Sequence, residues 1–209
     1  MTAAASEPGF LVLHALRLKG FAETPVVAVR AGLSEEEAGR RLEKASADGW
    51  VSRRDGRISG WALTPDGRAR HTEQIAAELA ESGVGPQVDA AYRAFLAVNH
   101  ELLSVCTDWQ LRAGQLNDHT DGSYDADVVA RLGAVDAAVQ PTCANLAAAL
   151  ERFCDYGPRL AEALARVRAG ERDWFAKPMI DSYHTVWFEL HEDLLSTLGI
   201  ERSKEGSML

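Results

Sequence analysis

Two histidines and a tryptophan in the last thirty residues of the sequence have a spacing that could build a binding surface. His184, Trp187 and His191 are three and four residues apart, so a helix places them on one face. Two imidazoles and an indole beside apolar residues could orient a polar small molecule between helices. The same pattern is typical of hydrogen-bonded histidines and aromatic residues in a helical core.

A metal site is a sharper hypothesis for the same residues, with His100 or His119 as the third ligand. Two histidines seven residues apart reach one ion only if their side chains bend toward each other, and the i, i+4 pair of a metalloprotease helix is absent. We therefore favour the core interpretation over metal binding, and we expect no metal and no other cofactor.

A polar loop from Gly114 to Asp125 is the second segment with unusual chemistry. Its order of Asn, Asp and Gly residues is loosely like a calcium loop, but the twelfth position is Val128 instead of a bidentate Glu. Turn and cap formation is the favoured role for this loop, and we expect Asp125 to cap the helix that follows. The further candidates for ligand binding, in this loop and in the helix before it, are Trp109, Asn117, His119 and Tyr124. A core position is the simpler interpretation for Trp109.

Catalysis is not indicated by the sequence. It contains no GxSxG, Walker, GxGxxG or HExxH motif, and no pair of carboxylates has surroundings that would raise a pKa. The three cysteines, Cys106, Cys143 and Cys154, match no zinc or CxxC spacing, so we expect buried, unreactive thiols.

The first seventy residues contain the clearest series of structural signals. Gly32 is suited to a turn with positive φ, and Ser34 followed by Glu37 forms a capping box that starts a helix. Ala38, Leu42 and Ala45 share the core face of this helix, and the opposite face carries Glu36, Arg40, Glu43, Lys44 and Ala47. This outward face is the predicted recognition surface.

A hairpin and another helix complete this region. Residues 50–54 and 58–63 have the composition of strands, Asp55-Gly56 is a hairpin turn signal, and Thr64-Pro65 starts a helix that continues toward Leu79. The order of three helices, strand, wing, strand and helix is that of a winged helix-turn-helix.

Residues 10–72 resemble the DNA-binding module of MarR-like and PadR-like bacterial regulators. The segments "AGLS", "GWVSR" and "WALTPDGR" stand in the order and spacing of that family. The sequence departs from it in having no preceding dimerisation helix and no aromatic-rich opening, so the subfamily and the effector stay open. The resemblance implies double-stranded DNA as the partner, contacted by Arg40, Arg41 and Lys44 of the recognition helix and by Arg53, Arg54 and Arg57 of the wing.

Charge is distributed unevenly along the chain. Residues 1–72 contain eleven Lys or Arg and nine Asp or Glu, whereas the rest contains eleven basic and twenty-two acidic residues, which gives the net charge of -9. The negative charge of residues 73–209 would repel DNA and so steer it toward residues 1–72. The acidic start of the recognition helix, Glu35 to Glu37, instead favours the alternative of a protein-interaction adaptor without specific DNA binding.

The sequence predicts a mainly α protein of two domains. Residues 1–82 form the expected winged helix with its linker helix, and residues 83–209 an all-helical dimerisation and effector-sensing domain. The helices expected in the second domain are 88–113, 125–155 with a kink or break near Gln140-Pro141, 158–169 and 179–198.

We therefore expect a one-component transcriptional regulator, not an enzyme. It would act as a homodimer on DNA and respond to a small-molecule effector. The sequence has no transmembrane stretch and no secretion signal, so the expected location is the cytoplasm and no membrane partner is expected.

Overall fold

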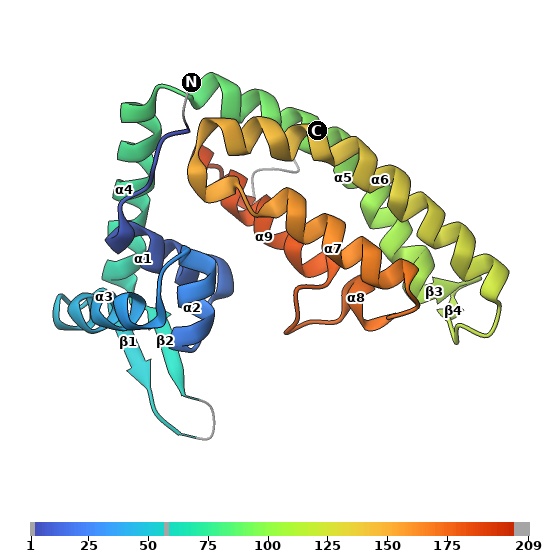
Figure 1. The fold of residues 1–209 in the computed structure, drawn as a ribbon, viewed down its shortest axis with the longest axis horizontal. Coiled ribbons are helices and arrows are strands. Elements are labelled where there is room, and N and C mark those ends of the chain that lie inside the picture. The colour runs from blue at the N-terminus through green and yellow to red at the C-terminus, as the bar shows by residue number, and fades with distance from the viewer. Residues whose placement is uncertain (1–2, 57–58, 203–209) are drawn as a thin grey trace. The chain divides into compact units, whose positions relative to one another are not determined.

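Most of the chain is helical in the computed structural model, which describes residues 3–56 and 59–202 (Figure 1). The chain divides into two units. The N-terminal unit comprises residues 4–85 together with 192–209, and the helical unit comprises residues 1–3 and 86–191. Each unit is described below by itself.

Three helices open the N-terminal unit at the positions that the sequence predicts. They are α1 (Pro8–Lys19), α2 (Thr24–Ala31) and α3 (Glu35–Ala47). Gly32 ends α2 in the left-handed conformation with φ of 64°, and the Ser34 hydroxyl accepts a hydrogen bond of 3.2 Å from Glu37 N. Because Gly lacks a Cβ, it adopts this turn without strain. The capping role of Ser34 is confirmed, whereas the Glu37 carboxylate contacts two arginines of its own helix.

A two-stranded antiparallel hairpin follows and projects away from the helices (Figure 1). Its strands are β1 (Val51–Arg54) and β2 (Gly60–Leu63), paired from Val51 with Leu63 to Arg54 with Gly60. The segment between α1 and α2 joins the outer edge of β2, since Ala22 N donates to Trp61 O at 3.1 Å and Trp61 N donates to Ala22 O at 2.8 Å. Among the described residues, the predicted second strand starts at Gly60 and not at Ser59, and its predicted first residue, Ile58, lies outside the described residues together with Arg57.

Helix α4 (Pro65–Ser82) packs its start against the turn that precedes β1. Thr64 caps it by accepting from Gly67 N at 3.0 Å, and the same hydroxyl donates to Gly49 O at 2.7 Å. A Cβ on Gly67 would lie 1.8 Å from Trp50 O, so only glycine allows this approach. The predicted cap and the N1 proline are both confirmed.

One apolar core holds these elements together. Its buried members come from α1, α2, α3, the Ala22 segment and both strands: Val12, Leu13, Ala15, Leu16, Ala22, Val27, Ala31, Leu42, Ala45, Val51, Trp61 and Leu63. The buried face of α3 is the predicted one, with Ala38 and Leu42 fully enclosed. Three helices followed by a hairpin around this core form a winged-helix-like arrangement.

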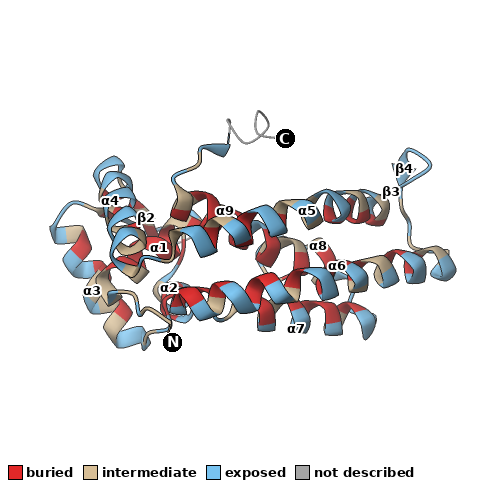
Figure 2. Cartoon of the chain, turned by 90° about the horizontal axis from the view of Figure 1, so that it is seen from above, coloured by how far each residue is buried: buried red, intermediate tan, exposed pale blue. Residues whose placement is uncertain are grey.

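The helical unit is built from long helices with buried and exposed residues alternating along their length (Figure 2). Its elements are α5 (Gly85–Gln110), β3 (Leu111–Arg112), β4 (Gln115–Leu116), α6 (Gly122–Ala149), the 3-10 turn η1 (Glu151–Phe153), α7 (Tyr156–Arg168), α8 (Asp173–Ala176) and α9 (Tyr183–Leu198). Helix α6 continues through Pro141 as one helix, which decides between the two predicted alternatives.

In the helical unit, five boundaries differ from the predictions by three residues or more. Helix α5 starts at Gly85 instead of 88, and α6 ends at Ala149 instead of 155, because Leu150 is extended and the 3-10 turn η1 follows it. Helix α5 ends at Gln110 because Ala113 and Gly114 both adopt positive φ (50° and 78°) and turn the chain into the small β3–β4 hairpin. Helix α6 starts at Gly122, since Asp121 is its N-cap and not Asp125. Helix α9 starts at Tyr183 instead of Met179. The division between the units runs within α9, after His191.

Candidate functional site

Helix α3 presents a charged face to solvent in the N-terminal unit. All five residues predicted for the outward face are exposed, namely Glu36, Arg40, Glu43, Lys44 and Ala47. Arg41, beside this face, is half-buried. The packing of α3 therefore leaves the predicted recognition surface accessible.

Each basic residue of this surface is paired with a carboxylate. Arg40 contacts Glu36 and Glu37, Arg41 Nε lies 2.7 Å from Glu37 Oε1, and Lys44 Nζ lies 3.0 Å from Asp48 Oδ2. The hydrogen bond from Arg41, followed by that from Arg40, lowers the pKa of the Glu37 carboxyl. The hydrogen bond to Glu37 raises the pKa of Arg40. Each of these cations is thus offset by a carboxylate, and the acidic residues of α3 outnumber its basic ones.

The hairpin carries the other predicted cations. Arg53 lies between two acids, with Nη1 3.4 Å from Glu43 Oε1 and Nε 2.9 Å from Asp55 Oδ1. Its guanidinium also lies over the Trp61 ring, 5.4 Å from the centroid. Arg54 is exposed, and Arg57 lies outside the described residues. An ion pair between Arg53 and Glu43 therefore connects strand β1 to α3.

The predicted ligand-binding residues of the polar loop come together around Asp125 in the helical unit. Asn117 Nδ2 donates to Asp125 Oδ1 at 3.0 Å and to Trp109 O at 3.2 Å, and His119 Nδ1 lies 2.9 Å from Asp125 Oδ2. The Trp109 ring stacks on Phe175 with centroids 4.2 Å apart and an interplanar angle of 4°. The buried Asp125 is thus the centre of this cluster, which is a different role from the predicted helix cap.

Tyr124 and Asp121 fix the start of α6 beside this cluster. The Tyr124 hydroxyl donates to Asp108 O at 3.1 Å. The Asp121 carboxylate accepts from Ser123 Oγ at 2.6 Å, from Ser123 N at 3.1 Å and from Tyr124 N at 3.2 Å. These bonds, the Ser123 hydroxyl first, lower the pKa of Asp121 to about 2. The loop therefore has the capping function predicted for it, supplied by Asp121.

The aromatic face of α9 packs in the core of the helical unit. Trp187 is 3% exposed, its ring lies 4.7 Å from that of Phe95, and its Nε1 donates to Asn99 Oδ1 at 2.9 Å. The His191 ring lies 5.1 Å from the same Phe95 ring. His184 is half-buried, and burial lowers its pKa. With its N–H satisfied inside the core, Trp187 has the contacts of a packing residue.

A buried polar cluster of the N-terminal unit was not identified from the sequence. His14 Nδ1 and His71 Nε2 lie 3.0 Å apart, and His14 Nε2 lies 3.0 Å from Asp193 Oδ2. Arg30 Nη2 lies 3.7 Å from the same Asp193 oxygen, and the Phe10 ring lies against both histidines. His14 in the apolar segment LVLHAL is the signal that could have shown that a polar group is buried there.

Arg159 is the corresponding buried cation of the helical unit. Its guanidinium contacts Asp181 at 3.0 Å and Glu189 at 2.8 Å. Burial opposes the charged form, but the carboxylates of Glu189 and Asp181 outweigh it and raise the pKa of Arg159. With two close carboxylates as partners, this guanidinium is poorly placed to hold an anionic ligand.

The thiols differ in accessibility. Cys106 and Cys143 are buried, and burial raises the pKa of each thiol to about 12. Cys154 is exposed, contrary to the prediction that the thiols are buried. In residues 3–56 and 59–202, no group of three or more His, Cys, Asp or Glu side chains is arranged to hold a metal ion. No helix of the described chain is long and apolar enough to cross a membrane.

The sequence matches no protein-family model, no curated protein and no solved structure. The helices and hairpin of the N-terminal unit are therefore the basis on which a function can be argued.

Proposed function

We propose that this chain is a one-component transcriptional regulator of the MarR-like and PadR-like kind. The N-terminal unit binds double-stranded DNA, and the helical unit forms a homodimer and senses a small molecule. The observation that carries the proposal is the arrangement of α3 and the β1–β2 hairpin around one core, with the Ala22–Trp61 backbone bridge fixing the hairpin to the start of α2. This arrangement supports insertion of α3 into the major groove and contact of the hairpin with flanking phosphates.

The ion pairs of α3 are compatible with DNA binding. Because Arg40 and Lys44 are exposed, their pairs with Glu36, Glu37 and Asp48 are screened by water and salt. Phosphate oxygens or base edges can replace such carboxylates as acceptors. Arg54, exposed on the hairpin, is the best-placed described cation for a phosphate contact.

A dimer provides the symmetry that this mode of binding requires. Two recognition helices spaced by one DNA turn, roughly 34 Å, match a palindromic operator. An effector that binds one packing of the helical unit more tightly than another favours that packing. The change alters the distance between the two recognition helices and so weakens or strengthens DNA binding. The Asp125 cluster, with Trp109, Asn117 and His119, is the proposed sensing region of the helical unit.

Fluorescence anisotropy with labelled DNA tests the proposal. The DNA is the region upstream of the chain's own gene, and a random duplex of equal length is titrated in parallel across a salt series. We expect preference for the upstream fragment and affinity that falls with salt. Arg54→Ala should reduce the slope of log affinity against log salt by about 0.9, the value for one phosphate contact.

Arg93→Ala is the matched control. Arg93 is an exposed arginine of α5 whose Nη2 lies 2.9 Å from Asp89 Oδ2, so its removal changes the net charge by the same amount outside the predicted surface. An equal effect of both variants, or no binding to either duplex, contradicts the proposal.

The acidic character of α3 favours one second candidate, a winged-helix adaptor that binds a protein. Glu35, Glu36 and Glu43 are exposed on the helix that would face the groove. Failure of DNA binding in a folded sample, together with retention of dimer formation, would favour this candidate.

A further inference from the structure

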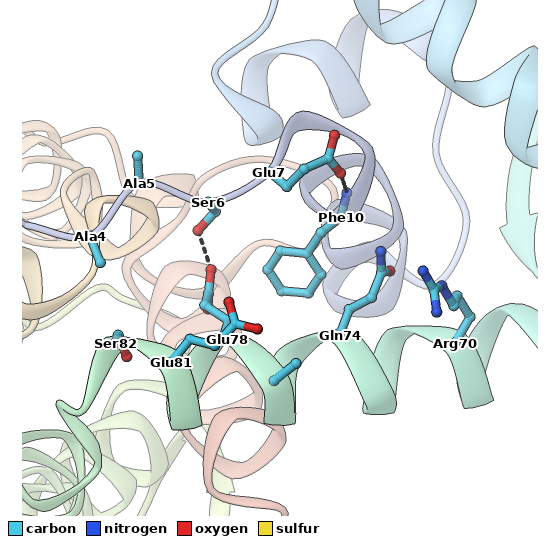
Figure 3. Close-up of a pocket in the computed structure, with 11 residues that line it drawn as sticks. Ala4, Ala5, Ser6, Glu7, Phe10, Arg70, Gln74, Glu78, Glu81 and Ser82 are labelled. Carbon is cyan, nitrogen blue, oxygen red and sulfur yellow. Dashed lines mark hydrogen bonds between the residues drawn. The ribbon is translucent and has the colours of Figure 1, made fainter.

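A cavity of about 590 Å³ lies within the N-terminal unit, between the segment that precedes α1 and one face of α4 (Figure 3). This volume falls within the range of small-molecule sites, roughly 300–1,000 Å³. Its lining residues come from residues 4–10 and from α4: Ala4, Ala5, Ser6, Glu7, Phe10, Arg70, Gln74, Ala77, Glu78, Glu81 and Ser82.

The walls combine an aromatic ring with an excess of negative charge. The Phe10 ring extends from the start of α1 toward α4, where Glu78 and Glu81 lie (Figure 3). Three glutamates and one arginine are present among the described lining residues. That arginine, Arg70, lies over the Trp50 ring at 5.2 Å and has Nη1 3.5 Å from Glu73 Oε2. The cavity therefore attracts cations and repels anions.

The polar side chains of the walls differ in whether they already form hydrogen bonds or ion pairs within the protein. Glu7 caps α1 through Phe10 N at 3.0 Å and also lies 3.6 Å from Arg41 Nη1. Ser6 Oγ donates to Glu78 across the cavity (Figure 3). Glu81 is exposed on α4. Glu81 is therefore the carboxylate that can meet a ligand without disturbing the cap at Glu7 or the bond between Ser6 and Glu78.

Two buried polar atoms on this wall are unsatisfied. Gln74 Oε1 and Arg70 Nε have no hydrogen-bond partner among the described residues. A buried acceptor without a partner is costly. The last torsion of a glutamine is soft, so a small rotation would let Gln74 Oε1 accept from an N–H donor placed in the cavity.

We propose that this cavity binds an organic cation, an ammonium group carried on an apolar body. The ammonium lies beside α4 and donates to Glu81 and to Gln74 Oε1, while the Phe10 ring, 3% exposed and packed against His14 and His71, closes the end of the cavity. The apolar body lies against Ala77 and the two alanines of the N-terminal segment. Its role as an effector site rests on the proposed function, whereas binding itself does not.

Isothermal titration calorimetry of the full chain with three probes of similar size and different charge tests the site. The probes are phenethylammonium, 2-phenylethanol and phenylacetate. We expect phenethylammonium to bind about tenfold or more tightly than the neutral alcohol, as one partly desolvated charge contact would give, and phenylacetate to bind least. Equal affinity for the three probes, or absence of binding by phenethylammonium, overturns the proposal.

Two variants and a control locate the binding. Glu81→Gln should weaken phenethylammonium binding about fivefold and leave the alcohol unaffected. Ala77→Leu, which fills the cavity with a good helix former, should weaken both. Asp66→Asn removes a charge from the first turn of the same helix, at an exposed position outside the lining residues, and should change neither. Equal responses to Glu81→Gln and Asp66→Asn refute the site. Because these titrations contain no DNA, absence of phenethylammonium binding would contradict the cavity site and would not affect the test of DNA binding.

Discussion

Replacing Gly67 by alanine should separate α4 from the segment that starts the hairpin. The added Cβ would lie 1.8 Å from Trp50 O and 2.7 Å from Trp50 C, whereas the closest comfortable carbon to oxygen distance is about 3.3 Å. The start of α4 must therefore move by roughly 1.5 Å. This movement breaks the bonds from Thr64 N to Trp50 O at 3.0 Å and from Thr64 Oγ1 to Gly49 O at 2.7 Å and Trp50 O at 3.1 Å. The Thr64 hydroxyl has one proton, which its two acceptors share, so two donors lose their bonds. At about 1 kcal/mol for each, we expect a loss of about 2 kcal/mol in unfolding free energy.

Urea denaturation followed by far-UV circular dichroism measures this loss. The matched control is Gly39→Ala in α3, where the new Cβ would meet only Thr24 Cγ2 at 3.8 Å. Alanine in an open helical position stabilises by about 0.5–1 kcal/mol. The two substitutions should therefore have opposite signs. A Gly67→Ala variant as stable as the unchanged chain would refute the reasoning that close backbone approach selects this glycine.

Three other perturbations test the buried and capping groups. Asp193→Asn keeps the side-chain volume but removes the charge beside His14 and Arg30, and should lower the unfolding free energy by about 3 kcal/mol in a urea titration. Glu43→Gln, at an exposed carboxylate paired with Arg53, should cost less than about 1 kcal/mol, and equal costs would contradict the role of burial. Asp121 has its pKa lowered from 3.8 to about 2, so the stabilisation by this cap is present above pH 4 and is lost as the pH falls through about 2. The ¹³C chemical shift of the Asp121 carboxyl should titrate with a midpoint of about 2, and a midpoint near 3.8 would contradict the role of the cap. A thiol reagent should modify one cysteine, Cys154, in the native chain and all three after denaturation, because the other two are buried with raised pKa values; fast reaction of a second thiol would be inconsistent with that burial.

The N-terminal elements could be predicted because their signals are local. Gly32, Ser34 and the Thr64-Pro65 pair each act on the backbone within a few residues. The buried face of α3 follows in the same way from the spacing of Ala38, Leu42 and Ala45. Where local propensity and tertiary packing favour the same structure, the sequence alone is informative.

The end of α5 and the start of α6 were predicted less well because nearby residues compete there. Asp121 and Asp125 are equally good caps by residue type. Contacts with Asn117 and His119, which the sequence does not show, hold Asp125 inside the cluster. The positive φ of Ala113 could not be predicted from the sequence either, because alanine is a strong helix former that rarely adopts this conformation.

The candidate sites were predicted in part. Residue types indicated Trp109, Asn117 and His119 as separate candidates, and the structure brings them together. The pairing of Arg40 with two acids of its own helix follows from i, i+3 and i, i+4 spacing and could have been read in advance. The contacts of Asp193 could not, because they join residues far apart in the chain.

The discontinuity of the N-terminal unit has a consequence for how the chain is made. Residues 192–209 belong to the same unit as residues 4–85, so a ribosome completes the entire helical unit before it supplies the last piece of the first one. Asp193, beside the buried His14 and Arg30, is among the residues that arrive late. Until Asp193 has been added, Arg30 of the nascent N-terminal region lacks the carboxylate that it contacts in the folded structure. Domains usually fold in order of synthesis, but here the N-terminal unit can be completed only after the helical unit has been made.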